Sequence, residues 1–341
     1  MKLVSVIMAV RNSEKYVGQA IESVLLQTYR NLEFIIIDDC SNDKTLKIIK
    51  DYKDKDKRIK IYRNKIKKGP AQSRNIAIKH AKGEWIAIID SDDVFFPKKI
   101  EKQLHLVGKK KEVIFAGTSF IFTDETGKHQ AYYKYKNNSE LIKRNILKNK
   151  NFPPHSSYFI KKKYLEIIKG YNPRYLMAPD YDLLLRLQMF QNKKFSVCEE
   201  VLTKVRIHDK NRSLKKIKNF SQLDFAILAN ICFQIYLKFQ VYPSQQYNNK
   251  EWEKFQSLVR LYITKLNYYK FLVNKIKYKK RKKILEYLKY FFDINFFKSY
   301  FVGHVLPAEF QKKFFLVYEK KFIKESNRII NKDLDQRIEV S

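Results

Sequence analysis

The sequence GEWIAIIDSDD, residues 83–93, joins a short apolar run to three carboxylates, Asp90, Asp92 and Asp93. A continuous apolar run of this length is typical of a strand that is covered on both faces of a parallel sheet. Carboxylates that gather at the end of a strand repel one another, so they indicate a cationic partner at that point. The stretch therefore predicts an α/β fold and marks the edge of the sheet where a site is expected.

Apolar runs of strand length alternate with amphipathic patterns on the N-terminal side of this stretch. The expected strands cover residues 3–10, 32–39, 59–64 and 84–90. The expected helices between them cover residues 11–29, 40–52 and 71–81. Such alternation predicts a mostly parallel sheet with helices on both faces. Ligands of such sheets bind beyond the carboxyl ends of the strands, so residues 9–12, 38–43 and 90–93 are expected to meet at one edge.

The pattern is less regular from residue 95 to residue 214. Here we expect a helix over residues 97–107, strands around residues 113–123 and a helix within residues 178–190. After residue 214 the chain contains long, aromatic-rich and lysine-rich helical segments, including residues 224–239. We therefore expect a helical module over residues 215–341 to follow an α/β domain whose two halves are residues 1–95 and 96–214.

The composition favours anionic partners. The chain has 341 residues, with 70 Lys and Arg against 35 Asp and Glu, which gives a net charge of +35. Such an excess suits phosphates, nucleic acid or anionic lipid head groups, although scattered lysines make a general composition bias an equal explanation. The three cysteines, Cys40, Cys198 and Cys232, have no paired spacing, so neither a disulfide framework nor a zinc site is indicated.

No targeting or membrane-spanning segment is expected. The apolar N-terminal stretch is too short for a signal peptide and is followed at once by Arg11. No later run approaches the ~20 apolar residues of a membrane span. We therefore expect a cytoplasmic protein, either soluble or peripherally attached to the inner face of the cell membrane.

Five segments in order resemble the inverting family 2 glycosyltransferases, which have the GT-A fold. They are VSVIMAVRN (4–12), IIIDDCSNDKT (35–45), GPAQSRNIAIKHAKGEWIAIIDSDD (69–93), APDYDLLLRL (178–187) and VRIHDKNRS (205–213). The resemblance implies a Rossmann-like, mostly parallel sheet flanked by helices. It also implies transfer of a sugar from a nucleotide diphosphate to an acceptor hydroxyl. Residues 1–95 would then bind the nucleotide sugar and residues 96–214 the acceptor.

The resemblance also implies a donor site. Asp39 would accept a hydrogen bond from the uracil N–H, which favours a UDP-sugar donor, and its alternative role is to cap the following helix. Arg74 would face the diphosphate or pair with Asp90. Cys40 stands where the family usually has glycine, so the backbone turn there can differ. The implied donor-binding residues are Ala9, Val10, Arg11, Glu14, Asp39, Arg74, Asp90, Ser91 and Arg206.

A metal and a general base complete the implied site. Asp90 and Asp92 form the D-x-D pair, with Asp92 as the direct ligand of Mn²⁺ or Mg²⁺ and His208 as a further ligand. Inverting transfer requires a base to take the proton of the attacking hydroxyl. The resemblance assigns this role to Asp180, with Asp182 as the rival and helix capping as the alternative. His155 is expected on the acceptor side as a positioning residue.

Other classes of function remain open at this point. A metal-dependent nucleotidyltransferase could use a similar sheet, and a basic, aromatic-rich surface suits a nucleic-acid-binding protein. No nucleic-acid recognition motif is present, so we expect no nucleic-acid partner.

The C-terminal segment and the substrates also leave alternatives. The basic cluster at residues 275–283, beside the amphipathic residues 284–292, suits an anionic membrane surface, while a helical cap or a homodimer contact is the alternative. The expected acceptor is a glycan or a lipid-linked molecule of bacterial polysaccharide or lipooligosaccharide biosynthesis.

Overall fold

A computed structural model describes residues 2–108, 110–209, 211, 221–240, 242–257 and 259. The chain divides into two compact units, residues 1–234 and residues 235–341. The first unit contains the sheet and its helices. The expected boundary after residue 214 falls among residues 212–220, outside the described residues, so the three-part division stays a prediction.

The N-terminal half of the sheet is parallel, as the sequence predicts. Its strands run in the spatial order β3, β2, β1, β4, and each neighbouring pair is parallel. Their bounds are β1 Val4–Val10, β2 Leu32–Asp38, β3 Ile59–Arg63 and β4 Trp85–Ile88. All seven residues of β2 are buried, which confirms that this continuous apolar run is covered on both faces.

The other half of the sheet mixes the two strand directions. It continues from β4 in the order β8, β6, β9, β5, with β7 beside β6. The β6–β9 pair is parallel, while β8 is antiparallel to both β4 and β6. The bounds are β5 Val94–Phe95, β6 Val113–Thr123, β7 His129–Tyr133, β8 Phe159–Lys161 and β9 Lys194–Arg206. The strands of both expected halves therefore belong to one α/β sheet.

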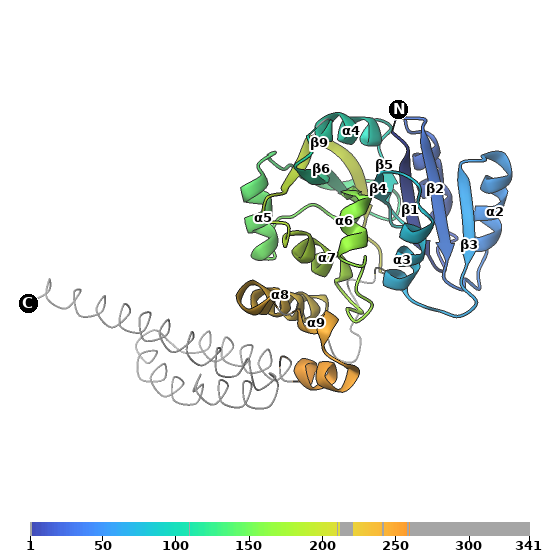
Figure 1. Cartoon of the computed structure of the whole chain (residues 1–341). Helices are drawn as coiled ribbons and strands as arrows, with labels where there is room; N and C mark the ends of the chain where they lie inside the picture. The colour runs from blue at the N-terminus through green and yellow to red at the C-terminus, as the bar shows by residue number, and fades with distance from the viewer. Residues whose placement is uncertain are drawn as a thin grey trace, which may run out of the picture. The chain divides into compact units, whose positions relative to one another are not determined.

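Helices cover both faces of the sheet (Figure 1). Right-handed crossovers place α1 and α2 on one face of the sheet. The connection from β3 to β4 runs back past β2 and β1, so its helix α3 lies on the other face. α4 packs against β6 and β9. The helices are α1 Val17–Leu25, α2 Thr45–Lys55, α3 Pro70–His80, α4 Lys99–Val107, α5 Ser139–Leu147, α6 Lys162–Ile167 and α7 Pro179–Leu187, with a 3₁₀ turn at His155–Ser157.

The strand ends meet at one edge, as expected. The register aligns Val10, Asp38 and Arg63 on neighbouring strands. The Asn12 N–H donates to the Ser41 hydroxyl at 3.1 Å, so the segments after β1 and β2 touch. The expected first helix starts later than predicted, at Val17, because residues 11–16 form turns that cross this edge.

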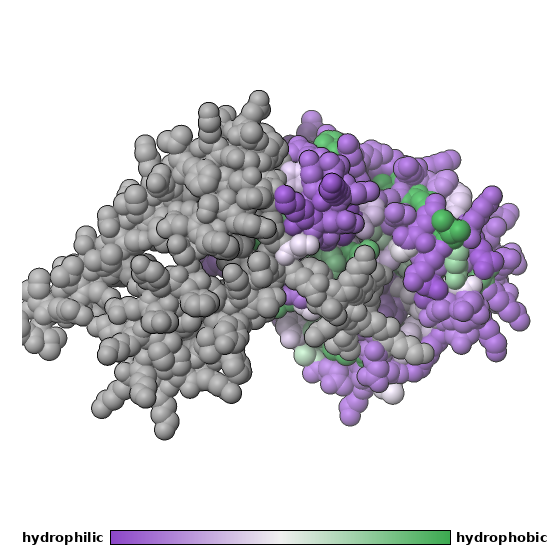
Figure 2. Space-filling view, turned by 90° about the horizontal axis from the view of Figure 1, so that it is seen from below, coloured by the Kyte–Doolittle hydropathy of each residue, from purple (hydrophilic) through white to green (hydrophobic). Residues whose placement is uncertain are grey.

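The described part of the C-terminal region is helical. α8 spans Gln222–Phe239, which confirms the expected helix over residues 224–239, and α9 spans Pro243–Gln246. Residues 275–292, the predicted membrane-binding segment, lie outside the described residues. Within the described ranges, every helix is too short or too polar to cross a bilayer. On the face in Figure 2 the described surface is mostly hydrophilic, with small separate apolar patches.

Candidate active site

A cavity of about 1230 Å³ opens at the carboxyl edge of the sheet. Its walls come from the segments after β1, β4 and β9 and from the start of α7, so residues far apart in the sequence meet there. The expected site residues that line it are Ala9, Arg11, Glu14, Arg74, Asp90, Ser91, Asp92, His155, Asp180, Arg206 and His208. Three expected residues, Val10, Asp39 and Asp182, are not part of the lining.

Asp90, just after β4, is held between the Arg74 guanidinium and the His155 imidazole. Arg74 Nη2 lies 2.5 Å from Asp90 Oδ1, and His155 Nδ1 lies 2.9 Å from Asp90 Oδ2. Burial alone would raise the pKa of Asp90, but His155 and Arg74 outweigh it and hold the pKa well below its usual range. Arg74 therefore pairs with Asp90, one of the two roles expected for it. His155, expected on the acceptor side, contacts this donor-side carboxylate.

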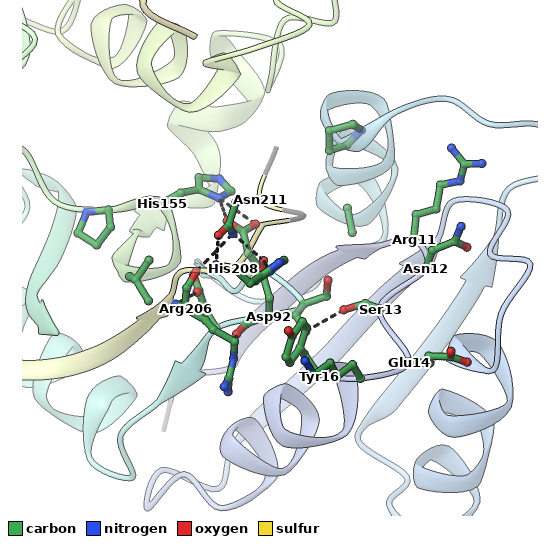
Figure 3. Close-up of a pocket in the computed structure, with 18 of the residues that line it drawn as sticks. Arg11, Asn12, Ser13, Glu14, Tyr16, Asp92, His155, Arg206, His208 and Asn211 are labelled. Carbon is green, nitrogen blue, oxygen red and sulfur yellow. Dashed lines mark hydrogen bonds and ion pairs between the residues drawn. The ribbon is translucent and has the colours of Figure 1, made fainter. Parts of the chain in front are cut away.

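Asp92 lies beside an imidazole and an amide from the segment after β9. His208 Nε2 is 3.0 Å and Asn211 Nδ2 is 3.3 Å from Asp92 Oδ2 (Figure 3). Burial and the neighbouring charge of Asp90 raise the pKa of Asp92. In the described part of the chain, His208 Nδ1 is buried without a hydrogen-bond partner. The negative charge of Asp92 is therefore not fully neutralised by His208 and Asn211.

Asp93 holds neighbouring segments together. Its carboxylate accepts hydrogen bonds from the Ser156 hydroxyl and, at 2.9 Å, from the Arg206 N–H. It is 5% exposed, and burial together with the charges of Asp92 and Asp90 raises its pKa well above the usual range. Asp93 therefore ties the strand end that carries the D-x-D pair to the 3₁₀ turn and to β9.

Arg206, at the end of β9, braces the cavity wall. Its guanidinium donates to Asp92 O at 3.0 Å, Glu125 O at 2.9 Å and Gln19 Oε1 at 2.7 Å. Its Cζ also lies 4.9 Å from the centre of the Tyr16 ring. The sequence predicts a donor-binding cation here, and the structure places Arg206 in the lining with its guanidinium engaged by these groups.

The segment after β1 forms another part of the lining. In Figure 3, Arg11, Asn12 and Glu14 lie apart from the Asp92 group. The Arg11 side chain is exposed, whereas Glu14 Oε2 accepts the N–H of Lys44 at 2.8 Å, just before α2. The donor-binding roles of Ala9, Arg11, Glu14 and Ser91 stay predictions, although each of these residues lines the cavity.

Asp39 holds a loop next to the cavity. Its oxygens accept hydrogen bonds from Asn64 Nδ2 at 2.8 Å and from the N–H groups of Lys68 and Gly69 at 2.7 and 2.8 Å. Asp39 is 4% exposed, so both oxygens are directed into the protein. The structure thus assigns Asp39 to the loop before α3 rather than to a cap on α2, and its contact with uracil stays a prediction.

The two candidate bases on α7 differ in accessibility. Asp180, in the first turn of α7, is partly exposed and lines the cavity. Asp182 is fully buried and pairs with Arg186, whose Nη2 and Nε lie 2.6 and 2.8 Å from Asp182 Oδ2. Ala178, just before the helix, has a left-handed φ of 51°, a strained conformation for a residue other than glycine. Of the two candidate bases, Asp180 alone lines this cavity.

Sequence reasoning missed three residues of this site. Asn211 follows His208 by three positions within the segment VRIHDKNRS, so the sequence could have indicated its contact with Asp92. Tyr16, whose ring centre is 4.9 Å from that of His208, is part of an ordinary helical pattern. Tyr171, whose hydroxyl is 2.8 Å from His155 Nε2, lies in a loop without any motif. The last two depend on tertiary contacts that local patterns do not contain.

Known proteins that are similar to this chain are glycosyltransferases. The family model described as glycosyl transferase family 2 matches residues 5–168. An uncharacterized glycosyltransferase of Methanocaldococcus jannaschii is 36% identical over 219 residues, which cover 63% of this chain and 74% of the relative. The Escherichia coli enzyme WfaP, a UDP-Glc:alpha-D-GlcNAc-diphosphoundecaprenol beta-1,3-glucosyltransferase, is 38% identical over 167 residues, or 45% of this chain and 65% of the relative.

A solved structure supports the fold. The S. aureus TarS 1-349 crystal structure in complex with UDP-GlcNAc superposes with a TM-score of 0.55 and 18% sequence identity. The match covers 75% of this chain and 78% of the TarS chain. At this identity the similarity concerns the fold alone.

Proposed function

We propose that this chain, which belongs to glycosyl transferase family 2, transfers a sugar from a UDP-sugar to a hydroxyl of a glycan or lipid-linked acceptor with inversion. The observation that carries the proposal is that Asp92, His208 and Asp180 line one cavity. The similar enzyme WfaP supports both substrate classes, because it is a UDP-Glc-dependent glucosyltransferase that acts on a diphosphoundecaprenol-linked sugar.

The chemistry of Asp92 and His208 fits a divalent cation. A carboxylate oxygen and an imidazole nitrogen lie 3.0 Å apart, and the raised pKa of Asp92 indicates that a positive charge there would be favourable. The described residues contain no group of three His, Cys, Asp or Glu side chains that could hold a metal ion, so Asp92 and His208 are the two ligands that this part of the chain would supply. Bound Mn²⁺ or Mg²⁺ would hold diphosphate oxygens and neutralise the charge of the leaving UDP.

Asp180 is the proposed general base. It would accept the proton of the acceptor hydroxyl as that oxygen attacks the anomeric carbon of the sugar, while UDP leaves from the opposite side. Pro179 at the first helical position fixes the start of α7, and Ala178 turns the chain into it. The helix therefore presents the Asp180 carboxylate at a defined place in the cavity wall.

Paired variants test the two roles. A panel of UDP-sugars would be assayed with Mn²⁺ for UDP release and for transfer to free and lipid-linked glycans. Asp92→Asn should lose metal-dependent thermal stabilisation by UDP, whereas Asp180→Asn should keep it and lose transfer by roughly 10²–10⁴-fold. Asp54→Asn, on the exposed side of α2, is the control and should change neither. Near-normal transfer by Asp180→Asn would exclude it as the base.

A further inference from the structure

Tyr171 supports both partners of the donor-side carboxylate. Its hydroxyl is 2.8 Å from His155 Nε2, and the other ring nitrogen of His155 is 2.9 Å from Asp90. The Cζ of Arg74 lies 5.5 Å from the centre of the Tyr171 ring. Tyr171 is 1% exposed, so these contacts are made inside the protein. A shift of Tyr171 would therefore reach Asp90 through His155 and through Arg74.

Asn75 on α3 holds Tyr171 by its backbone. Asn75 Nδ2 donates to Tyr171 O at 2.7 Å, and the Tyr171 N–H donates to Asn75 Oδ1 at 2.7 Å. The preceding Gly170 has a φ of +66°, and a Cβ there would lie 2.3 Å from Asn75 Oδ1. The absence of a side chain at residue 170 thus allows the two-bond contact, which fixes Tyr171 relative to α3.

The same loop is attached to the helix that carries the proposed base. We call residues 168–171 the bridging loop. Arg186 Nη1 on α7 donates to Ile168 O and Gly170 O, each at 2.8 Å. Arg186 is fully buried and its charge is balanced by Asp182 on the same helix. Because Asp180 lies in the first turn of this helix, the bridging loop connects the helix of the proposed base to the partners of Asp90.

We propose that Tyr171 is a positioning residue that sets the Asp90 side of the cavity relative to Asp180, so that donor and acceptor react with each other. The proposal rests on the proposed glycosyl transfer. Transfer requires the anomeric carbon, the acceptor oxygen and the base carboxylate to be aligned at the same time. Hydrolysis of the donor requires only a water molecule, which adjusts its position freely. Loosening this connection should therefore impair transfer much more than hydrolysis.

The ratio of transfer to hydrolysis is the appropriate readout, because a smaller folded fraction lowers both rates equally. Tyr171→Phe removes only the hydroxyl and leaves His155 Nε2 without this partner. Since a misplacement of about 1 Å can cost about 10²-fold in rate, we expect the ratio to fall about 10-fold or more. Hydrolysis per folded molecule, measured as UDP release without acceptor, should change less than about threefold by the same argument.

Tyr181→Phe is the matched control. Tyr181 is also a buried tyrosine, and its hydroxyl donates to Ile146 O at 2.8 Å and contacts Asn230 Nδ2 at 3.2 Å, away from the cavity lining. Its loss should lower stability and leave the ratio unchanged. Asn75→Ala should lower the ratio like Tyr171→Phe, and the double variant should fall less than the product of the two effects, because both act on one contact chain.

The outcomes separate this proposal from the proposed function. The measurement uses the full chain, the UDP-sugar that the wild type hydrolyses fastest and the best acceptor from a set of free and lipid-linked glycans. A ratio in Tyr171→Phe equal to that in Tyr181→Phe would overturn the positioning role and leave glycosyl transfer intact. No transfer by the wild type to any acceptor of the set would overturn the proposed function and, with it, this proposal.

Discussion

Lys99 should make the stability of the protein depend on pH in the alkaline range. This first residue of α4 is 0% exposed, and its Nζ lies 3.0 Å from Gln103 Oε1 and 3.9 Å from the centre of the Phe95 ring. Burial lowers its pKa from an ordinary 10.5 to about 7, although Cys198 opposes the change. Its position at the positive end of a helix also disfavours the charged form.

The size of the effect follows from this difference in pKa. A difference of about 3.5 units at about 1.4 kcal/mol each is about 5 kcal/mol. The contact with Phe95 favours the ammonium form by up to about 2 kcal/mol, which leaves at least about 3 kcal/mol. Between the two pKa values the unfolded chain binds more protons at Lys99 than the folded chain, so the free energy of unfolding rises with pH.

Urea unfolding of the wild type and Lys99→Met from about pH 6 to about pH 10 measures this contribution. The variant should gain stability relative to the wild type at the acidic end, and the advantage should shrink by about 3–5 kcal/mol toward the alkaline end. The loss of the Gln103 contact shifts all values equally, so the pH dependence is the test. Lys102→Met, which removes a partly exposed lysine of the same helix that pairs with Glu200, should show no such trend over this pH range. If the difference in the free energy of unfolding between Lys99→Met and the wild type did not change with pH, Lys99 would not be a buried neutral amine.

Two further predictions concern carboxylates outside the cavity lining. Asp182→Asn leaves the Arg186 guanidinium buried without its counter-charge, so urea unfolding should show a loss of about 3–5 kcal/mol, with UDP release without acceptor preserved per folded molecule. Lost transfer at unchanged stability would instead mark Asp182 as the base. Burial opposes ionisation of Asp39, yet hydrogen bonds from Lys68, Asn64 and Gly69 hold its pKa below 3.8, so its stabilisation should disappear as pH falls through that folded-state pKa. Asp39→Asn should be less stable at neutral pH and lose less on acidification, and equal acid sensitivity of the two proteins would contradict this reading.

The fold could be predicted because its signals are local. β1, β2 and β4 are continuous apolar runs, and each is followed by a helical pattern or by polar residues, so burial and direction are encoded within each segment. The start of α1 could not be predicted in the same way. The turn over residues 11–16 is held by Thr45, which accepts the Ser13 N–H at 2.7 Å, and by Ser91, whose carbonyl accepts from the Ser13 hydroxyl. Thr45 is the first residue of α2 and Ser91 follows β4, so no local pattern near residues 11–16 reports these partners.

The candidate site shows the same limit in its chemistry. The positions of Asp90, Asp92 and Asp180 follow from strand ends and a helix start, and all three line the cavity. What each carboxylate can do depends on neighbours from distant segments. Asp92 keeps a raised pKa beside His208, whereas His155 in the 3₁₀ turn and Arg74 on α3 hold the pKa of Asp90 well below its usual range. The spacing of acidic residues therefore predicts where a site lies. Which of the carboxylates remain available to a substrate or a metal ion depends on the buried cations beside them.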